Sequence, residues 1–112
     1  DMKAGEKIYK KYCFACHKAG DKARNLVGPV FNDLFGRTAG TVEGFKYSDA
    51  MRAAGENGVV WDEQTLRDYL PKPRDFVKDT KMTFVGLKKP DDIENLTPYL
   101  RQFSPDYVPP EQ

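Results

Sequence analysis

The two cysteines of the chain, Cys13 and Cys16, stand two residues apart, and its only histidine, His17, follows directly. Two cysteines are too few for the disulfide framework of a small secreted scaffold, so they have to form a local site. A closed zinc site needs about four protein ligands, and the sequence offers no other cysteine or histidine. A thioredoxin-like pair requires a strand before it, and none is visible. A plain local disulfide leaves the histidine unexplained.

The pattern Cys-x-x-Cys-His is instead the one that attaches haem covalently. The two thiols add to the two vinyl groups of the porphyrin, and the adjoining imidazole reaches the iron. The sequence therefore predicts one haem c, held by Cys13 and Cys16 and ligated through His17. A second histidine ligand is excluded, because the chain has none.

Methionine is the natural candidate for the second axial ligand. Met2 stands at the frayed start of the chain, and Met51 falls in a predicted helix, where methionine usually fills the core. Met82 stands in an irregular stretch, residues 80–84, from which a loop could present its sulfur to the iron. Position favours Met82 and leaves Met51 and an open sixth position as alternatives.

Length and composition suit one small domain built around a large apolar group. A chain of 112 residues forms a single core, and an apolar fraction of 39% is a modest supply for it. A formal charge of +1 gives no reason to expect nucleic acid, and no stretch is long enough to span a bilayer. The start at Asp1, without an apolar leader, leads us to expect a processed, exported protein.

The elements expected from periodicity and capping are helices joined by long loops. The first helix covers residues 3–13. The second is capped by Ser48, runs to Ala54 and stops at Gly55, and the third is capped by Asp62 and runs to Leu70. The fourth begins at Pro90 and carries an apolar stripe of Ile93, Leu96, Leu100 and Phe103. Residues 21–44, with a turn near 31–35, and residues 77–87 are expected to be loops. Pro98 lacks a backbone N–H and predicts a kink. We place a haem-binding domain at 1–104 and an extended tail at 105–112.

The chain resembles the class I, mitochondrial-like cytochromes c, and in particular their bacterial c2 type, over nearly its whole length. The matching residues, in order, are Gly5, Tyr9, the cysteine motif, Val27-Gly28-Pro29, Leu34-Phe35-Gly36-Arg37, Gly44-Phe45, Tyr47, Trp61, Tyr69-Leu70, Thr80-Lys81-Met82, Phe84, Leu96 and Tyr99-Leu100. The resemblance implies the class I cytochrome c fold, an all-α single domain of about four to five helices whose long loops wrap one haem.

The resemblance also implies site residues. Met82 would be the second iron ligand, and the Pro29 carbonyl would orient the His17 ring. The remaining haem-binding residues would be Arg37, Tyr47 and Trp61 at the inner propionate, Tyr69 at the Met82 sulfur, and Thr80. Without the resemblance, Arg37 would be interpreted as solvent-facing, and Trp61 and Tyr69 as ordinary core aromatic residues.

Several positions depart from the family pattern. Met51 and Ala39 replace an Asn and a Thr near the haem, and two additional residues stand between 55 and 60. Pro98 and the tail after Ser104 are also unusual. We expect Met51 to alter the hydrogen-bond network near the haem, and Pro98 and the tail to adapt the chain to its own partners.

The implied function is one-electron transport, since His17 and Met82 would leave no iron position for a substrate. The partners would be redox complexes, for example a cytochrome bc-type complex and a terminal oxidase or photosynthetic reaction centre, and the protein would be a monomer and not an enzyme. A haem enzyme or gas sensor with an open sixth position is the alternative. The implied location is the bacterial periplasm, or otherwise the mitochondrial intermembrane space. The docking face would comprise Lys7, Lys11, Arg74, Lys81, Phe84, Lys88 and Lys89.

Overall fold

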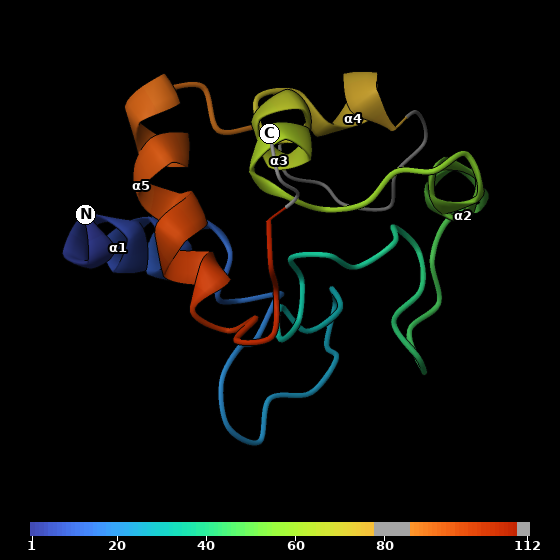
Figure 1. Cartoon of the computed structure of the whole chain (residues 1–112), viewed down its shortest axis with the longest axis horizontal. Coiled ribbons are helices and arrows are strands. Elements are labelled where there is room, and N and C mark those ends of the chain that lie inside the picture. The colour runs from blue at the N-terminus through green and yellow to red at the C-terminus, as the bar shows by residue number, and fades with distance from the viewer. Residues whose placement is uncertain (78–85, 110–112) are drawn as a thin grey trace.

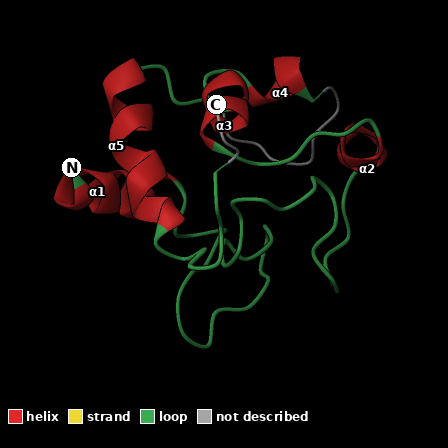
Figure 2. Cartoon of the chain, viewed as in Figure 1, coloured by secondary structure: helices red, strands yellow, loops and turns green. Residues whose placement is uncertain are grey.

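The computed structural model describes residues 1–77 and 86–109 (Figure 1). Within them the chain forms five helices and no strand, as Figure 2 shows by colour. The all-α prediction is therefore confirmed. The helices are α1 (Met2–Tyr12), α2 (Asp49–Glu56), α3 (Glu63–Tyr69), α4 (Pro73–Phe76) and α5 (Pro90–Arg101).

Helices α1 and α5 pack against each other at very close range. The Asp1 side chain caps α1 by accepting hydrogen bonds from the N–H groups of residues 3 and 4. Gly5 permits the close approach, because a β-carbon there would lie 2.2 Å from the Asn95 carbonyl oxygen and 2.7 Å from Cβ of Tyr99. The buried side chains at this contact come from both helices: Ile8, Tyr9, Ile93, Leu96 and Leu100.

Helix α5 begins at Pro90, as predicted, with acidic residues in its first turn. It continues past Pro98, which is exposed, and ends at Arg101. The kink at Pro98 stays a prediction. Phe103, expected at the end of the apolar stripe, follows the helix and is half-buried.

Helix α2 is capped by Ser48, whose Oγ accepts a hydrogen bond from Met51 N at 3.1 Å, but the predicted stop at Gly55 is wrong. The helix runs on to Glu56. A β-carbon on Gly55 would lie 1.9 Å from the Ala39 carbonyl oxygen. This glycine therefore serves a close contact between the helix and a loop rather than the end of the helix.

Helix α3 has the predicted cap at Asp62. The Asp62 carboxylate accepts from Thr65 N at 2.8 Å, and the Thr65 hydroxyl accepts from Asp62 N at 2.8 Å, which completes a reciprocal capping box. Helix α4 was not expected. Pro73 occupies the first position of this four-residue helix and is buried.

Two segments far apart in the sequence are joined by main-chain hydrogen bonds. Ala39 N donates to Val59 O at 2.9 Å, Trp61 N to Arg37 O at 2.9 Å, and Gly36 N to Trp61 O at 2.8 Å. We call residues 36–39 and 59–61 the paired segments. They hold Arg37 beside Trp61.

Residues 105–109 of the expected tail have no regular secondary structure apart from a turn at 105–106. Ser104, directly before them, is buried, and the Tyr107 ring packs edge-on against Phe35 with ring centres 5.4 Å apart. The described part of the tail thus lies on the body of the domain.

Candidate haem site

The cysteine motif forms a compact turn directly after α1. The N–H groups of Cys13 and Phe14 both donate to the Tyr9 carbonyl at 2.9 Å. The next two amides turn back onto Cys13: Cys16 N lies 3.1 Å and His17 N 2.8 Å from the Cys13 carbonyl oxygen. Local backbone bonding alone therefore places both sulfurs and the imidazole within one turn.

Both thiols are free and half-buried, which argues against the local disulfide. Burial, with a smaller contribution from Cys16, raises the pKa of the Cys13 thiol to about 12, so this thiol is neutral. Among the described residues no group of three His, Cys, Asp or Glu side chains is placed to hold a metal ion. Two unpaired thiols, two residues apart in one turn, fit covalent addition to the vinyl groups of haem.

The His17 ring is fixed by contacts on several sides. Nδ1 lies 2.9 Å from the Pro29 carbonyl oxygen, and the ring stacks on Phe31 with centres 4.3 Å apart and planes 11° apart. A β-carbon on Gly28 would lie 2.2 Å from Cε1, so only glycine fits there. The Tyr9 hydroxyl donates to the His17 carbonyl at 2.6 Å.

These contacts determine which nitrogen can bind a metal. A carbonyl oxygen only accepts, so Nδ1 carries the proton and Nε2 keeps the free lone pair. Burial is the main cause that lowers the pKa of His17, which favours the neutral imidazole that ligates iron. The motif and its surroundings therefore fit a covalently attached haem with Nε2 of His17 as an axial ligand.

The three residues implied at the propionate lie in one region. Nη2 of Arg37 donates to the carbonyls of Val30 at 2.9 Å and Asn32 at 2.6 Å, and burial is the main cause that lowers the pKa of Arg37. Tyr47 is close enough for its phenol to interact electrostatically with Arg37, and its hydroxyl accepts from the backbone N–H of residue 42 at 3.1 Å. Trp61 is buried, and the main-chain hydrogen bonds of the paired segments hold it beside Arg37.

Tyr69 belongs to an aromatic cluster. Its ring packs edge-on against Trp61 at 5.0 Å and against Phe76 at 5.8 Å, and Tyr69 and Trp61 are both buried. Met51, the alternative ligand, is half-buried and packs against the core. Four of the expected site residues lie outside the described residues: Thr80, Lys81, Met82 and Phe84.

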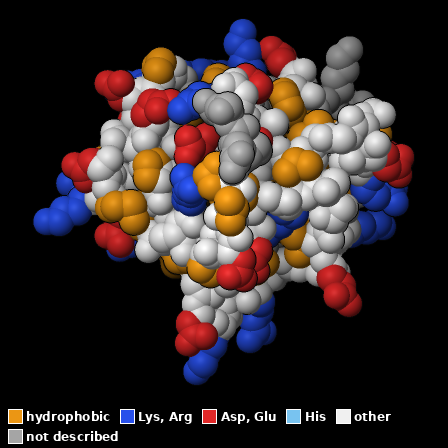
Figure 3. Space-filling view, in the orientation of Figure 1, with side chains coloured by type: hydrophobic (Ala, Val, Ile, Leu, Met, Phe, Trp, Pro, Cys, Tyr) orange, Lys and Arg blue, Asp and Glu red, His pale blue; other side chains and the backbone are white. Residues whose placement is uncertain are grey.

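The residues expected at the docking face, where described, are exposed: Lys7 and Lys11 on α1, Arg74 on α4, and Lys88 and Lys89 before α5. Lys88 Nζ donates to the Pro71 carbonyl at 2.5 Å, and Lys11 Nζ lies 5.0 Å from the centre of the Tyr12 ring. On the face in Figure 3, basic and acidic side chains are interspersed.

Sequence reasoning anticipated the Pro29 carbonyl beside His17 but missed the two other contacts of the ring, those with Phe31 and Gly28. Phe31 gave no signal, because its stacking on His17 depends on how the loop folds back. Gly28 could have been found, since a glycine beside a proline of a binding loop often marks a close backbone approach.

The chain is similar to known cytochromes c over most of its length. The cytochrome c family model matches residues 2–104. Cytochrome c2 of Afifella marina is 52% identical over 95% of this chain and 85% of its own length, and cytochrome c of Cannabis sativa is 46% identical over 91% and 89%. The solved structure of cytochrome c2 from Rhodospirillum centenum superposes with a TM-score of 0.85 at 40% identity, over 94% of this chain and 99% of that one.

These similarities confirm the predicted fold and cofactor. The chain carries one covalently bound haem c on the motif of Cys13, Cys16 and His17, and it is an electron carrier. It belongs to the cytochrome c family, in its class I, and is of the bacterial c2 type.

Proposed function

We propose that this chain transfers single electrons in the bacterial periplasm, from a cytochrome bc-type complex to a terminal oxidase or photosynthetic reaction centre. The observation that carries the proposal is the anchored His17 ring, whose Nδ1 lies 2.9 Å from the Pro29 carbonyl oxygen. An imidazole fixed in this way would change its position little between the two oxidation states of a bound haem, which would keep the rearrangement that accompanies electron transfer small.

In this proposal each haem-binding residue has a distinct task. Cys13 and Cys16 would hold the cofactor, and Nε2 of His17 and the Met82 sulfur would be the two iron ligands from the protein. The bound haem supplies an iron that changes its charge by one electron. The Pro29 carbonyl accepts a hydrogen bond from Nδ1–H of His17, which would strengthen Nε2 as an electron-pair donor to the iron.

The residues around the propionate set the local charge. Arg37 contributes a positive charge, which stabilises a carboxylate and favours the less positive, reduced state of the site. Tyr47 and Trp61 lie beside it and would complete the propionate contacts. Tyr69 would donate to the Met82 sulfur, and Thr80 would add a further contact to the cofactor.

With both axial positions filled by protein side chains, no position remains for a substrate, so we propose that the chain is not an enzyme. We propose that the chain acts as a monomer. Its partner complexes would be steered by charge to a docking face that comprises Lys7, Lys11, Arg74, Lys81, Phe84, Lys88 and Lys89. No helix among the described residues combines the length and the apolar character needed to cross a membrane.

The test is the visible and near-infrared spectrum of the purified holoprotein, oxidised and reduced, with carbon monoxide added to the reduced sample. We expect a weak oxidised band from sulfur-to-iron charge transfer and no response to carbon monoxide. Met82→Ala should lose that band and bind carbon monoxide, whereas the matched Met51→Ala should keep the wild-type spectrum. Loss of the band in Met51→Ala alone would refute Met82 as the ligand, and carbon monoxide binding by the wild type would favour an open-site enzyme or sensor.

A further inference from the structure

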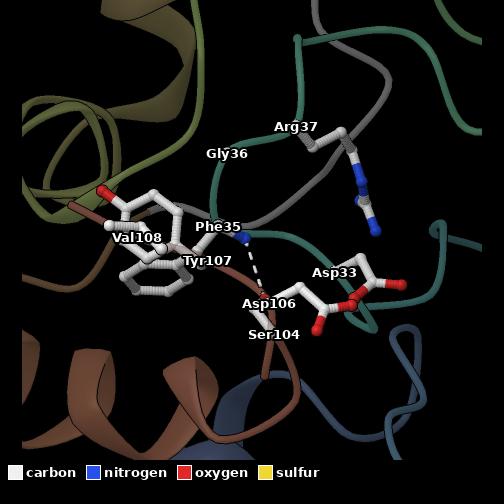
Figure 4. Close-up of a pocket in the computed structure, with 8 residues that line it drawn as sticks. All are labelled: Asp33, Phe35, Gly36, Arg37, Ser104, Asp106, Tyr107 and Val108. Atoms are coloured by element: carbon white, nitrogen blue, oxygen red, sulfur yellow. Dashed lines mark hydrogen bonds between the residues drawn. The ribbon is translucent and has the colours of Figure 1, made fainter. Parts of the chain in front are cut away.

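The end of the described chain is joined to the loop that carries Arg37. The Ser104 hydroxyl accepts a hydrogen bond from Phe35 N at 3.1 Å, between residues 69 positions apart, and Phe103 O accepts one from Asp33 N at 2.9 Å. Ser104 and Phe35 are both buried. Figure 4 shows this junction, which also lines a shallow pocket.

Tyr107 extends the junction by ring contacts. Its ring meets that of Phe35 edge-on, with centres 5.4 Å apart and planes at 69°. The Arg101 guanidinium lies 5.4 Å from the centre of the Tyr107 ring, within the range of a cation–π contact. Nη1 of Arg101 is in turn paired with the Glu63 carboxylate at 3.2 Å, so the end of α5 holds both the ring and α3.

Gly36, which directly precedes Arg37, lies close to the Tyr107 ring. Gly36 has a φ of +86°, and a β-carbon on it would lie 3.2 Å from Cδ1 of Tyr107. Its N–H donates to Trp61 O, and Arg37 O accepts from Trp61 N. The backbone before Arg37 is thus confined by the Tyr107 ring and by the paired segments.

The Arg37 side chain does not itself reach the tyrosine, and Figure 4 shows it directed away from Tyr107. It ends on the carbonyls of Val30 and Asn32. Any effect of Tyr107 on Arg37 must therefore pass through the backbone at Phe35 and Gly36.

We propose that Tyr107 is a positioning residue for Arg37: it holds residues 35 and 36 so that the guanidinium keeps its place and its effect on the reduction potential of the site. The inference rests on the role proposed above for Arg37. A loosened loop would spread the positive charge over more positions, which weakens its preference for the reduced state. Loss of the Tyr107 ring should then lower the midpoint potential.

The test compares variants of the full-length holoprotein by midpoint potential and by amide hydrogen exchange. Tyr107→Ala should lower the potential by less than Arg37→Gln does, and should speed exchange at the amides of Phe35 and Gly36 by about tenfold, which corresponds to loss of about 1.4 kcal/mol of local stability. If the alanine variant does not fold, Tyr107→Leu replaces it in the test, because leucine keeps apolar volume but removes the ring. In the double variant with Arg37→Gln, the change at Tyr107 should shift the potential no further.

Two variants act as controls. Tyr107→Phe keeps the ring, and Val108→Ala changes an exposed neighbour that lines the same pocket, so both should match the wild type in potential and exchange. A potential that falls in Arg37→Gln but not in Tyr107→Ala or Tyr107→Leu overturns the positioning role. An unchanged potential in Arg37→Gln instead overturns the role proposed for Arg37, and the inference with it.

Discussion

Replacing Gly5 by alanine should destabilise the protein, although alanine is the better helix former. The added methyl group would start 2.2 Å from the Asn95 carbonyl oxygen and 2.7 Å from Cβ of Tyr99. Ordinary contacts of a β-carbon begin near 3.4 Å, so α1 and α5 must separate by about 1 Å or bend. Neither neighbour can rotate away, because one is a backbone atom within α5 and the other is a β-carbon fixed to the backbone.

Two opposing effects set the magnitude. Overpacking of a close contact costs about 1–3 kcal/mol, and a backbone neighbour favours the upper end of that range. Alanine in place of glycine in a helix gains up to about 1 kcal/mol. We therefore expect a net loss of about 2 kcal/mol, which lowers the melting temperature by roughly 8 °C for a domain of this size.

The assay is unfolding of the holoprotein in guanidinium chloride, followed by far-ultraviolet circular dichroism. Lys3→Ala in the same helix is the matched control, since the Lys3 side chain is exposed and its loss should change stability by less than about 0.5 kcal/mol. A Gly5→Ala midpoint equal to or above that of the wild type would show that the helix contact does not require glycine.

Two further predictions concern charge. Hydrogen bonds from Arg67, at 2.7 and 3.3 Å, lower the pKa of Glu94 from its ordinary value of 4.5. The stabilisation by this pair is therefore fully present above pH 4.5, and it is lost as the pH falls through the lower pKa that Glu94 has in the folded protein. The stability difference between wild type and Glu94→Gln should therefore vanish in acid; a difference that persists there would contradict the pairing. Lys7→Glu and Lys89→Glu should slow electron transfer to a purified partner and weaken the salt dependence of its rate. Arg52→Glu is the control and should change neither, because α2 lies across the molecule from α1 in Figure 1. Equal rates in all three variants would contradict the docking face.

The sequence predicted well what local chemistry determines. The caps at Ser48 and Asp62 and the start at Pro90 depend on neighbours within one turn, so three helix starts were found. The cysteine motif is equally local, because its turn is closed by bonds to Cys13 O. Its chemistry could therefore be inferred from the order of the residues alone.

What escaped prediction depends on contacts between distant segments. Gly55 resembled a helix stop, but its lack of a side chain instead allows the Ala39 carbonyl, from a distant part of the sequence, to approach the helix closely. The stacking of Phe31 on His17 has no periodic signature. Tyr107 stands among prolines, a context that predicted an extended tail, and its packing depends on where Phe35 lies.

The paired segments have a consequence for how this family can vary. They join residues 36–39 to 59–61 through main-chain groups, so the bonds do not depend on which side chains stand there. Residues 40–58, which include α2, form a long connection whose two ends are held together by the paired segments. Lengthening such a loop costs little, about 0.6 kcal/mol for each doubling of its length. Insertions can therefore accumulate between 40 and 58 while Arg37 and Trp61 keep their mutual position.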